Sequence, residues 1–168
     1  MCPVTTSLLD HLPDRERSLV TEFFGAFAHA EYVLKSLGYI RRGREDAQAD
    51  WDVFANSIKT RFRPRASADL RQAWTALTNQ PPRKQVILDG QLGWRDAPRP
   101  PGRPAAAWGL VLVRRVRNNL FHGSKFILGG AGQFTRDREL VSAALVVLQH
   151  AVGLARSRTG RRSGHRAA

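Results

Sequence analysis

The chain has very little of several features that often define a protein class. Among its 168 residues is a single cysteine, Cys2, so no disulfide can form within the chain. It lacks any run of about 18 or more apolar residues, so no membrane-spanning helix is expected. Residues 1–17 carry acids early and no basic stretch ahead of an apolar one, which does not fit a secretory signal. The sequence therefore predicts a soluble, cytoplasmic protein with no membrane partner.

Common catalytic and cofactor signatures are also missing. The sequence has no Gly-x-Ser-x-Gly turn, no Cys/His set with metal-ligand spacing and no Rossmann glycine fingerprint. The run Gly129-Gly130-Ala131-Gly132 lacks the Lys and Ser/Thr that follow in a phosphate loop, so it indicates an interhelical turn. We therefore predict no metal site and no cofactor.

Negative charge is scarce as well. Fourteen acidic residues stand against 27 Lys and Arg, which gives a formal net charge of +13. Removing the five arginines of residues 156–168 from this total leaves +8 on residues 1–155. Such a field attracts polyanions, of which nucleic acid is the commonest in cells. Arginine enrichment from a high-GC coding sequence explains the tail equally well, whereas the charge of the body favours a nucleic-acid partner.

The hydrophobic fraction of 42% and the length predict one domain over residues 1–155 and an Arg-rich, disordered tail over residues 156–168. Apolar residues recur at three- and four-residue steps in five segments, which predicts helices over residues 14–37, 49–62, 68–77, 105–122 and 136–155. The predicted fold class is all-α, an antiparallel bundle of four or five helices.

Residues 79–104 are rich in proline and glycine and form one long irregular insertion before the fourth predicted helix. Within it, residues 86–92 contain an Asp-Gly pair between short apolar runs. This pattern fits either a small hairpin or a loop that is held to the core by Trp94.

The most informative stretch is Arg117-Asn118-Asn119-Leu120-Phe121-His122, at the end of the fourth predicted helix. Histidine titrates near neutral pH and can take or give a proton. Arginine stays charged and offers a fixed fork of donors to phosphate oxygens. Together they can perform metal-free phosphoryl chemistry, although an Arg and a His at this spacing also occur by chance in many helices.

This motif resembles the signature of the HEPN superfamily, the higher eukaryotes and prokaryotes nucleotide-binding domains. That signature is R-x(4–6)-H at the end of the third core helix, often with a polar residue after the arginine, and Arg117, Asn118 and His122 match it. The opening helix ahead of Gly38 and the final helix from Arg136 are similar too, so the resemblance spans roughly residues 15–155.

The resemblance implies an HEPN-like helical domain that acts on RNA. Many members are metal-independent endoribonucleases, often toxins of toxin–antitoxin pairs or antiviral effectors, and they cut tRNA, mRNA or rRNA. They usually act as homodimers with a composite active site, and an antitoxin or another regulatory protein is a possible further partner.

Helix geometry makes sense of a dimer. Five steps along a straight helix give roughly 140° of net rotation and a rise of about 7.5 Å, so Arg117 and His122 of one chain point apart. Either the helix distorts before Gly123, or two chains complete the site between them. A two-fold dimer is the simpler solution.

The roles follow from residue type. His122 acts as general base or general acid, Arg117 stabilises the charge on phosphorus, and Asn118 orients the histidine or the phosphate. The expected products are a 2′,3′-cyclic phosphate and a 5′-hydroxyl. Arg114, Arg115 and Lys125 are expected to position RNA phosphates.

Two further residues are candidates for support of the motif. Asn119 lies within it. Glu31 can point into the bundle beside the motif helix, although a surface position is the favoured expectation. Ser124 stands where some toxin members carry a tyrosine that a nucleotidyltransferase modifies, so no link to that subgroup is expected. The alternatives to an RNase are a non-catalytic RNA- or nucleotide-binding subunit and a helical dimerisation scaffold in a larger complex.

Overall fold

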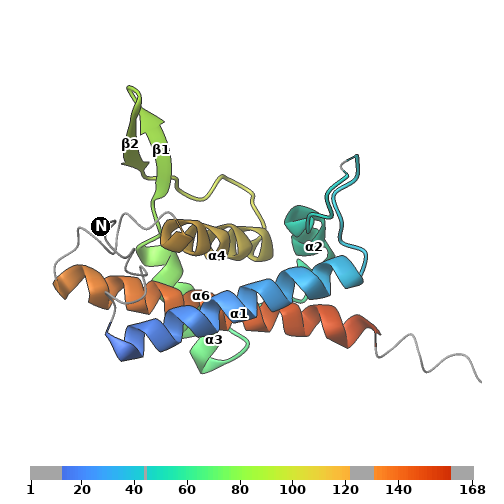
Figure 1. The fold of residues 1–168 in the computed structure, drawn as a ribbon. Helices are drawn as coiled ribbons and strands as arrows, with labels where there is room; N and C mark the ends of the chain where they lie inside the picture. The colour runs from blue at the N-terminus through green and yellow to red at the C-terminus, as the bar shows by residue number, and fades with distance from the viewer. Residues whose placement is uncertain (1–12, 44, 122–130, 160–168) are drawn as a thin grey trace, which may run out of the picture.

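The computed structural model describes residues 13–43, 45–121 and 131–159 (Figure 1). This part of the chain is mostly helical, as predicted, and its insertion contains a two-stranded sheet, which is the hairpin rather than the loop of the two predicted alternatives. The elements are α1 (Asp14–Ser36), α2 (Trp51–Ile58), α3 (Ala68–Asn79), β1 (Lys84–Leu88), β2 (Gln91–Arg95), α4 (Ala105–Phe121) and α6 (Ala131–Thr159).

The three long helices set the architecture. Helices α1 and α6 pack along each other and run in the same direction, while α4 packs beside α6 and runs the opposite way (Figure 1). Helix α3 packs against α6, and α2 packs against α4. The parallel pair of α1 and α6 departs from the antiparallel arrangement that was expected of neighbouring helices.

Aromatic side chains join α2 to α1. The predicted apolar stripe of α1 is confirmed, because Phe23, Phe27 and Leu34 are all buried. The ring of Trp51 stacks on Phe27 with their centroids 5.2 Å apart. Phe54, fully buried, meets the ring of Tyr39 edge-on at 5.3 Å. Burial of such large apolar surfaces is the main favourable term in folding, so these contacts fix α2 beside the C-terminal half of α1.

Capping side chains define where the short helices begin. The Asp50 carboxylate accepts a hydrogen bond from the Val53 backbone N–H at 2.9 Å, and α2 starts at the next residue, Trp51. The Ser67 hydroxyl accepts a hydrogen bond from the Leu70 N–H at 3.2 Å at the start of α3. Helix α2 ends at Ile58, so the predicted range 49–62 was too long at both ends.

The Asp-Gly pair forms a hairpin. Strands β1 and β2 pair antiparallel with Leu88 opposite Gln91, and the two residues between them both have positive φ, 49° for Asp89 and 78° for Gly90. This geometry matches the right-handed twist of the strands. The hairpin projects away from the helices (Figure 1), and the side chains of Ile87 and Leu92 are 73% and 74% exposed.

The last helix is longer than predicted at both ends. It begins at Ala131, within the expected glycine-rich turn, and reaches Thr159, so the first residues of the predicted disordered tail are helical. Near its C-terminal end, the Arg61 guanidinium donates to the Leu154 carbonyl at 2.7 Å and to Ser157 Oγ at 3.0 Å. This contact attaches the C-terminal part of α6 to the α2–α3 connection, through a residue far away in the sequence.

Within α6, the segment Thr135–Ala155 is long and apolar enough to cross a membrane by length and composition alone. More than half of its most apolar stretch is buried inside the protein. Its contacts with α1, α3 and α4 identify it as the central core helix of this fold.

Candidate functional site

The motif lies on the last turns of α4. Arg117 and Asn118 are within the helix, which ends at Phe121. His122 follows this last residue directly, and both His122 and Lys125 lie outside the described residues. The described part of the candidate site is therefore its arginine and amide side.

A hollow of about 320 Å³ opens beside Arg117, and we call it the motif groove. Helix α4 forms one side of it, and α1 and the segment leading into α2 form the other. Its lining residues are Phe27, Glu31, Arg41, Ala47, Gln48, Ala49, Trp51, Arg114, Arg117 and Asn118.

The Arg117 guanidinium is held on two sides. Its Nη1 donates to Asn118 Oδ1 at 3.0 Å, and its Cζ lies 5.4 Å from the centre of the buried Phe27 ring. A cation over an aromatic face is attracted by the ring quadrupole. Arg117 and Asn118 therefore contact each other at the wall of the groove, and the ring of Phe27 on α1 packs against the arginine.

Arg114 lies one turn earlier on the same side of α4. Burial lowers the pKa of its guanidinium, the charges of Asp52 and Glu31 raise it, and the charges of Arg41 and Arg103 lower it. Because an arginine pKa starts far above neutrality, Arg114 stays charged. The groove thus holds a half-buried, fully charged donor in the position predicted for a phosphate contact.

Glu31 lies in the groove rather than at a simple surface position, which corrects the favoured expectation. Its side chain is half-buried, and Trp51 Nε1 donates to its Oε1 at 3.4 Å. It supplies the one carboxylate among the lining residues, against the three arginines 41, 114 and 117. The groove therefore keeps a net positive charge, which suits a phosphodiester.

Part of the groove wall comes from the segment between α1 and α2, and we call residues 40–43 and 45–49 the arm. Ile40 and Ala49 form an isolated antiparallel bridge, and the Arg41 N–H donates to the Gln48 carbonyl at 2.9 Å. This pairing brings Arg41 and Gln48 to the groove. Neither residue was among the predicted site residues, because no periodicity or motif marks this loop. Phe27 belongs to the apolar stripe of α1, and a stripe does not show which residues pack above it.

The environment of Arg115 differs from that of Arg114 and Arg117, which line the motif groove. Its Nη1 donates to the Ala97 carbonyl at 2.7 Å, and its guanidinium lies 5.1 Å from the centre of the Trp108 ring. Burial lowers the pKa of this group as well. These contacts attach the irregular insertion to α4, and Arg115 does not line the motif groove.

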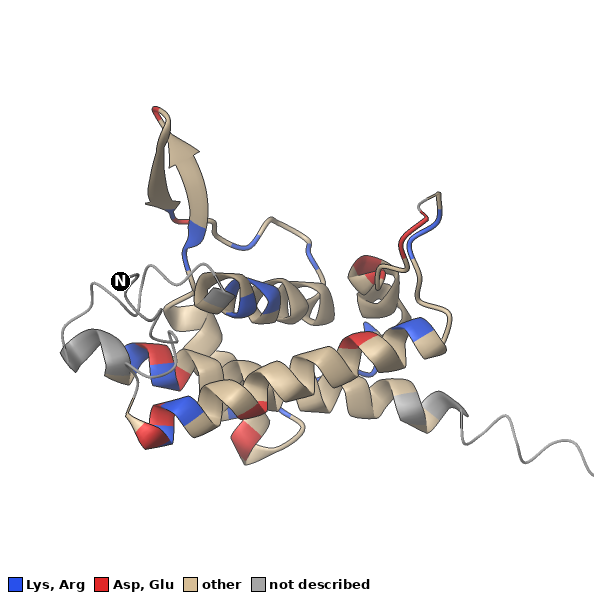
Figure 2. Ribbon diagram, in the orientation of Figure 1, with Lys and Arg blue, Asp and Glu red and all other residues tan. Residues whose placement is uncertain are grey.

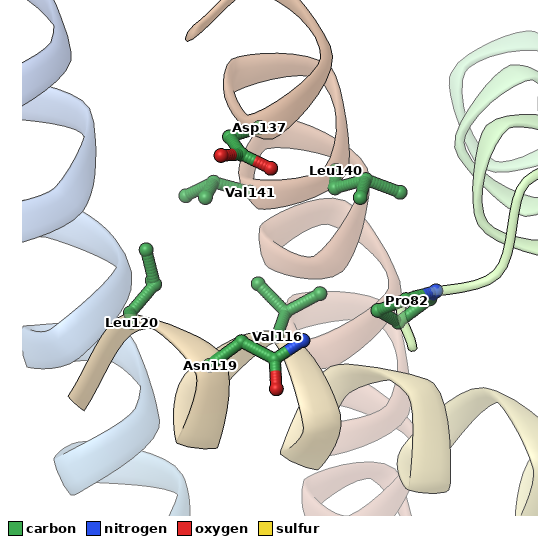
Figure 3. Close-up of a pocket in the computed structure, with 7 residues that line it drawn as sticks. All are labelled: Pro82, Val116, Asn119, Leu120, Asp137, Leu140 and Val141. Atoms are coloured by element: carbon green, nitrogen blue, oxygen red, sulfur yellow. The ribbon is translucent and has the colours of Figure 1, made fainter. Parts of the chain in front are cut away.

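Asn119 points away from the groove and supports the insertion instead. It is buried, and its Nδ2 donates to the Arg83 carbonyl at 3.0 Å, next to the start of β1. Figure 3 shows its amide nitrogen turned toward Pro82, at the edge of a cavity of about 20 Å³ between α4 and α6. The motif thus contains one residue that positions the hairpin.

Replacing Asn119 by alanine is expected to lower the free energy of unfolding by about 1 kcal/mol, because the hydrogen bond from this buried amide to the Arg83 carbonyl is lost. Chemical denaturation monitored by circular dichroism measures this change. The neighbouring exposed Asn118 is the matched control, and its replacement by alanine is expected to stay within about 0.5 kcal/mol of the wild type. Equal effects of the two substitutions would contradict the assignment.

Positively charged residues are frequent on the C-terminal half of α4 and next to the hairpin (Figure 2). Figure 2 shows Lys and Arg on the C-terminal half of α4 and on the segments next to the hairpin, whereas the arm, α1 and the start of α6 carry both signs. No family model, no curated protein and no solved structure matches this chain.

Proposed function

We propose that this chain is a metal-independent endoribonuclease of the HEPN type, which acts as a toxin or phage-defence effector on tRNA, mRNA or rRNA. The observation that carries the proposal is the motif groove. In it, Arg117 and Asn118 contact each other beside a basic hollow at the C-terminal end of α4, five residues before His122.

The proposed chemistry is attack of a ribose 2′-oxygen on the adjacent phosphorus. The bond from phosphorus to the 5′-oxygen breaks, which leaves a 2′,3′-cyclic phosphate and a 5′-hydroxyl. His122 takes the 2′-hydroxyl proton or supplies the proton that the leaving 5′-oxygen needs. Arg117 stabilises the charge that develops on the phosphoryl oxygens, Asn118 orients the reacting groups, and Arg114 holds a neighbouring phosphate.

The proposal includes an assembly. Helices α1, α3, α4 and α6 belong to an HEPN-like bundle, and two copies of the chain form a homodimer in which both motifs face one cleft. Two copies supply one histidine for each proton transfer, and they double the positive charge that the substrate meets. The protein is placed in the cytoplasm, where RNA is available and an antitoxin or regulatory partner can control it.

The test is incubation of the purified full chain with total RNA and with tRNA in EDTA, read on a denaturing gel with analysis of the fragment ends. We expect discrete fragments with cyclic-phosphate ends from the wild type and intact RNA from the His122→Ala variant. Equal cleavage by both proteins would overturn the assignment. Intact RNA with both, together with salt-sensitive RNA binding, would favour the non-catalytic binding subunit.

A further inference from the structure

A second hollow lies at the other end of α4 and shares no residue with the motif groove. It has a volume of about 700 Å³ and lies between the α2–α3 connection, α3 and the first residue of α4. Four arginines line it, Arg63, Arg65, Arg71 and Arg99, and no carboxylate does. We call it the arginine hollow.

The four arginines come from three separate segments of the chain. Arg63 and Arg65 lie in the turn between α2 and α3, which the Ala66 N–H closes by donating to the Arg63 carbonyl at 2.9 Å. Arg71 comes from α3. Arg99 comes from the insertion, and its guanidinium donates from Nε to the Arg103 carbonyl at 3.0 Å and from Nη2 to the same oxygen. Arg63, Arg65 and Arg71 are close in sequence, and the fold adds Arg99 from the insertion to the same hollow.

Nothing in the described part of the chain neutralises this cluster. No ion pair joins any of the four arginines to a described carboxylate. All four arginines are exposed and line the same hollow, so a bound anion lowers the repulsion between their like charges. The start of α4 adds to the field, because Ala105 lines the hollow and the first turn of α4 carries no acidic residue, so the partial positive charge of the helix N-terminus is not offset there.

An aromatic ring lies beside the charges. Trp74 lines the hollow, is half-buried, and has its centroid 6.0 Å from that of Phe62. It packs closely against α4, where a Cβ added to Gly109 would lie 3.1 Å from Trp74 Cζ3. A flat ring held in place at the edge of a basic hollow is a stacking surface for a nucleobase.

We propose that the arginine hollow binds a nucleotide-type ligand, in which the arginines bind linked phosphate groups and Trp74 stacks on a base. Arginine suits this role because its planar fork makes paired hydrogen bonds to phosphate oxygens. The volume lies within the usual range of small-molecule sites. The same chemistry is presented by a single strand of RNA and by a free nucleoside triphosphate. The proposal does not depend on RNA cleavage.

The test is binding of ATP, by isothermal titration calorimetry, and of a fluorescein-labelled hexauridine, by anisotropy, to the full chain. The Arg63→Gln/Arg71→Gln variant is expected to bind its ligand at least about tenfold more weakly, because charge-assisted hydrogen bonds to phosphate are lost. The control with the same net charge is Arg15→Gln/Arg95→Gln, whose two exposed arginines lie on α1 and β2. It is expected to change affinity by less than about twofold for a local site.

The two probes distinguish a free nucleotide from an RNA strand as the ligand. ATP binding that the double substitution weakens identifies a free nucleotide site, whereas weakened hexauridine binding without ATP binding identifies a contact for an RNA strand. No saturable binding of either probe to the wild type, or equal binding by the two variants, would overturn the proposal. The single Arg65→Gln variant, at an exposed turn residue, repeats the comparison if the double variant has a lower melting temperature.

Discussion

Replacing Arg117 by alanine is expected to lower the rate of RNA cleavage by about 10²- to 10³-fold, the usual effect of losing a donor that stabilises transition-state charge. In the groove, Arg117 contacts Asn118 and lies over Phe27, so its guanidinium is already oriented before a substrate arrives. Preorganised donors need little rearrangement when charge develops on phosphorus. Single-turnover cleavage of a labelled RNA in EDTA measures the loss.

Two variants make this prediction specific. Arg117→Lys keeps the charge but loses the planar fork, so we expect a rate between those of the alanine variant and the wild type. Arg15→Ala removes an exposed arginine at the start of α1, far along the sequence from the motif, and is expected to leave the rate unchanged. The Arg117→Ala protein should keep its helical circular dichroism spectrum. A folded Arg117→Ala variant that cleaves at the wild-type rate would remove Arg117 from the mechanism.

The second large effect concerns stability. Replacing Phe54 by alanine is expected to lower the free energy of unfolding by about 3–5 kcal/mol, since a large side chain is removed and a cavity remains. Phe54 is fully buried and contacts the rings of Tyr39 and Trp51, at centroid distances of 5.3 and 6.4 Å. Domains of this size are usually stable by about 5–15 kcal/mol, so such a loss is a large fraction of the total.

Urea denaturation followed by circular dichroism measures this change. The control is the adjacent Val53, which is 55% exposed on the same helix, and Val53→Ala is expected to stay within about 0.5 kcal/mol of the wild type. A loss below about 1 kcal/mol for Phe54→Ala would mean that α2 is not part of the core. Trp51 is the first residue of α2 and lines the motif groove, so we also expect Phe54→Ala to bind RNA more weakly than Val53→Ala does.

Local signals predicted several elements correctly. The apolar stripe of α1 is buried as expected, and the predicted stop, Gly38, has a φ of 84°, a conformation that favours glycine. Ser67 caps α3. In each case a few residues that are adjacent in sequence contain the whole physical cause, which is why the sequence was sufficient.

Other features depended on contacts between distant residues. The C-terminal extension of α6 is supported by Arg61, and the role of Arg115 in holding the insertion depends on the Ala97 carbonyl. Glu31 faces the groove because α2 places Trp51 beside it. None of these partners lies within a few residues along the chain, so no spacing rule reveals them.

The sequence by itself determined that the described chain is mostly helical, where most helices begin, that the charge is strongly positive and that Arg117 and Asn118 lie in the last turns of a helix. Only the tertiary structure decided which arginines gather around each hollow, that α1 and α6 run in parallel, and that Asn119 and Arg115 hold the insertion. The physical reason is that helix caps and apolar periodicity depend on residues a few positions apart. The two hollows and the contacts that hold the insertion arise instead from packing between segments that lie far apart in the sequence.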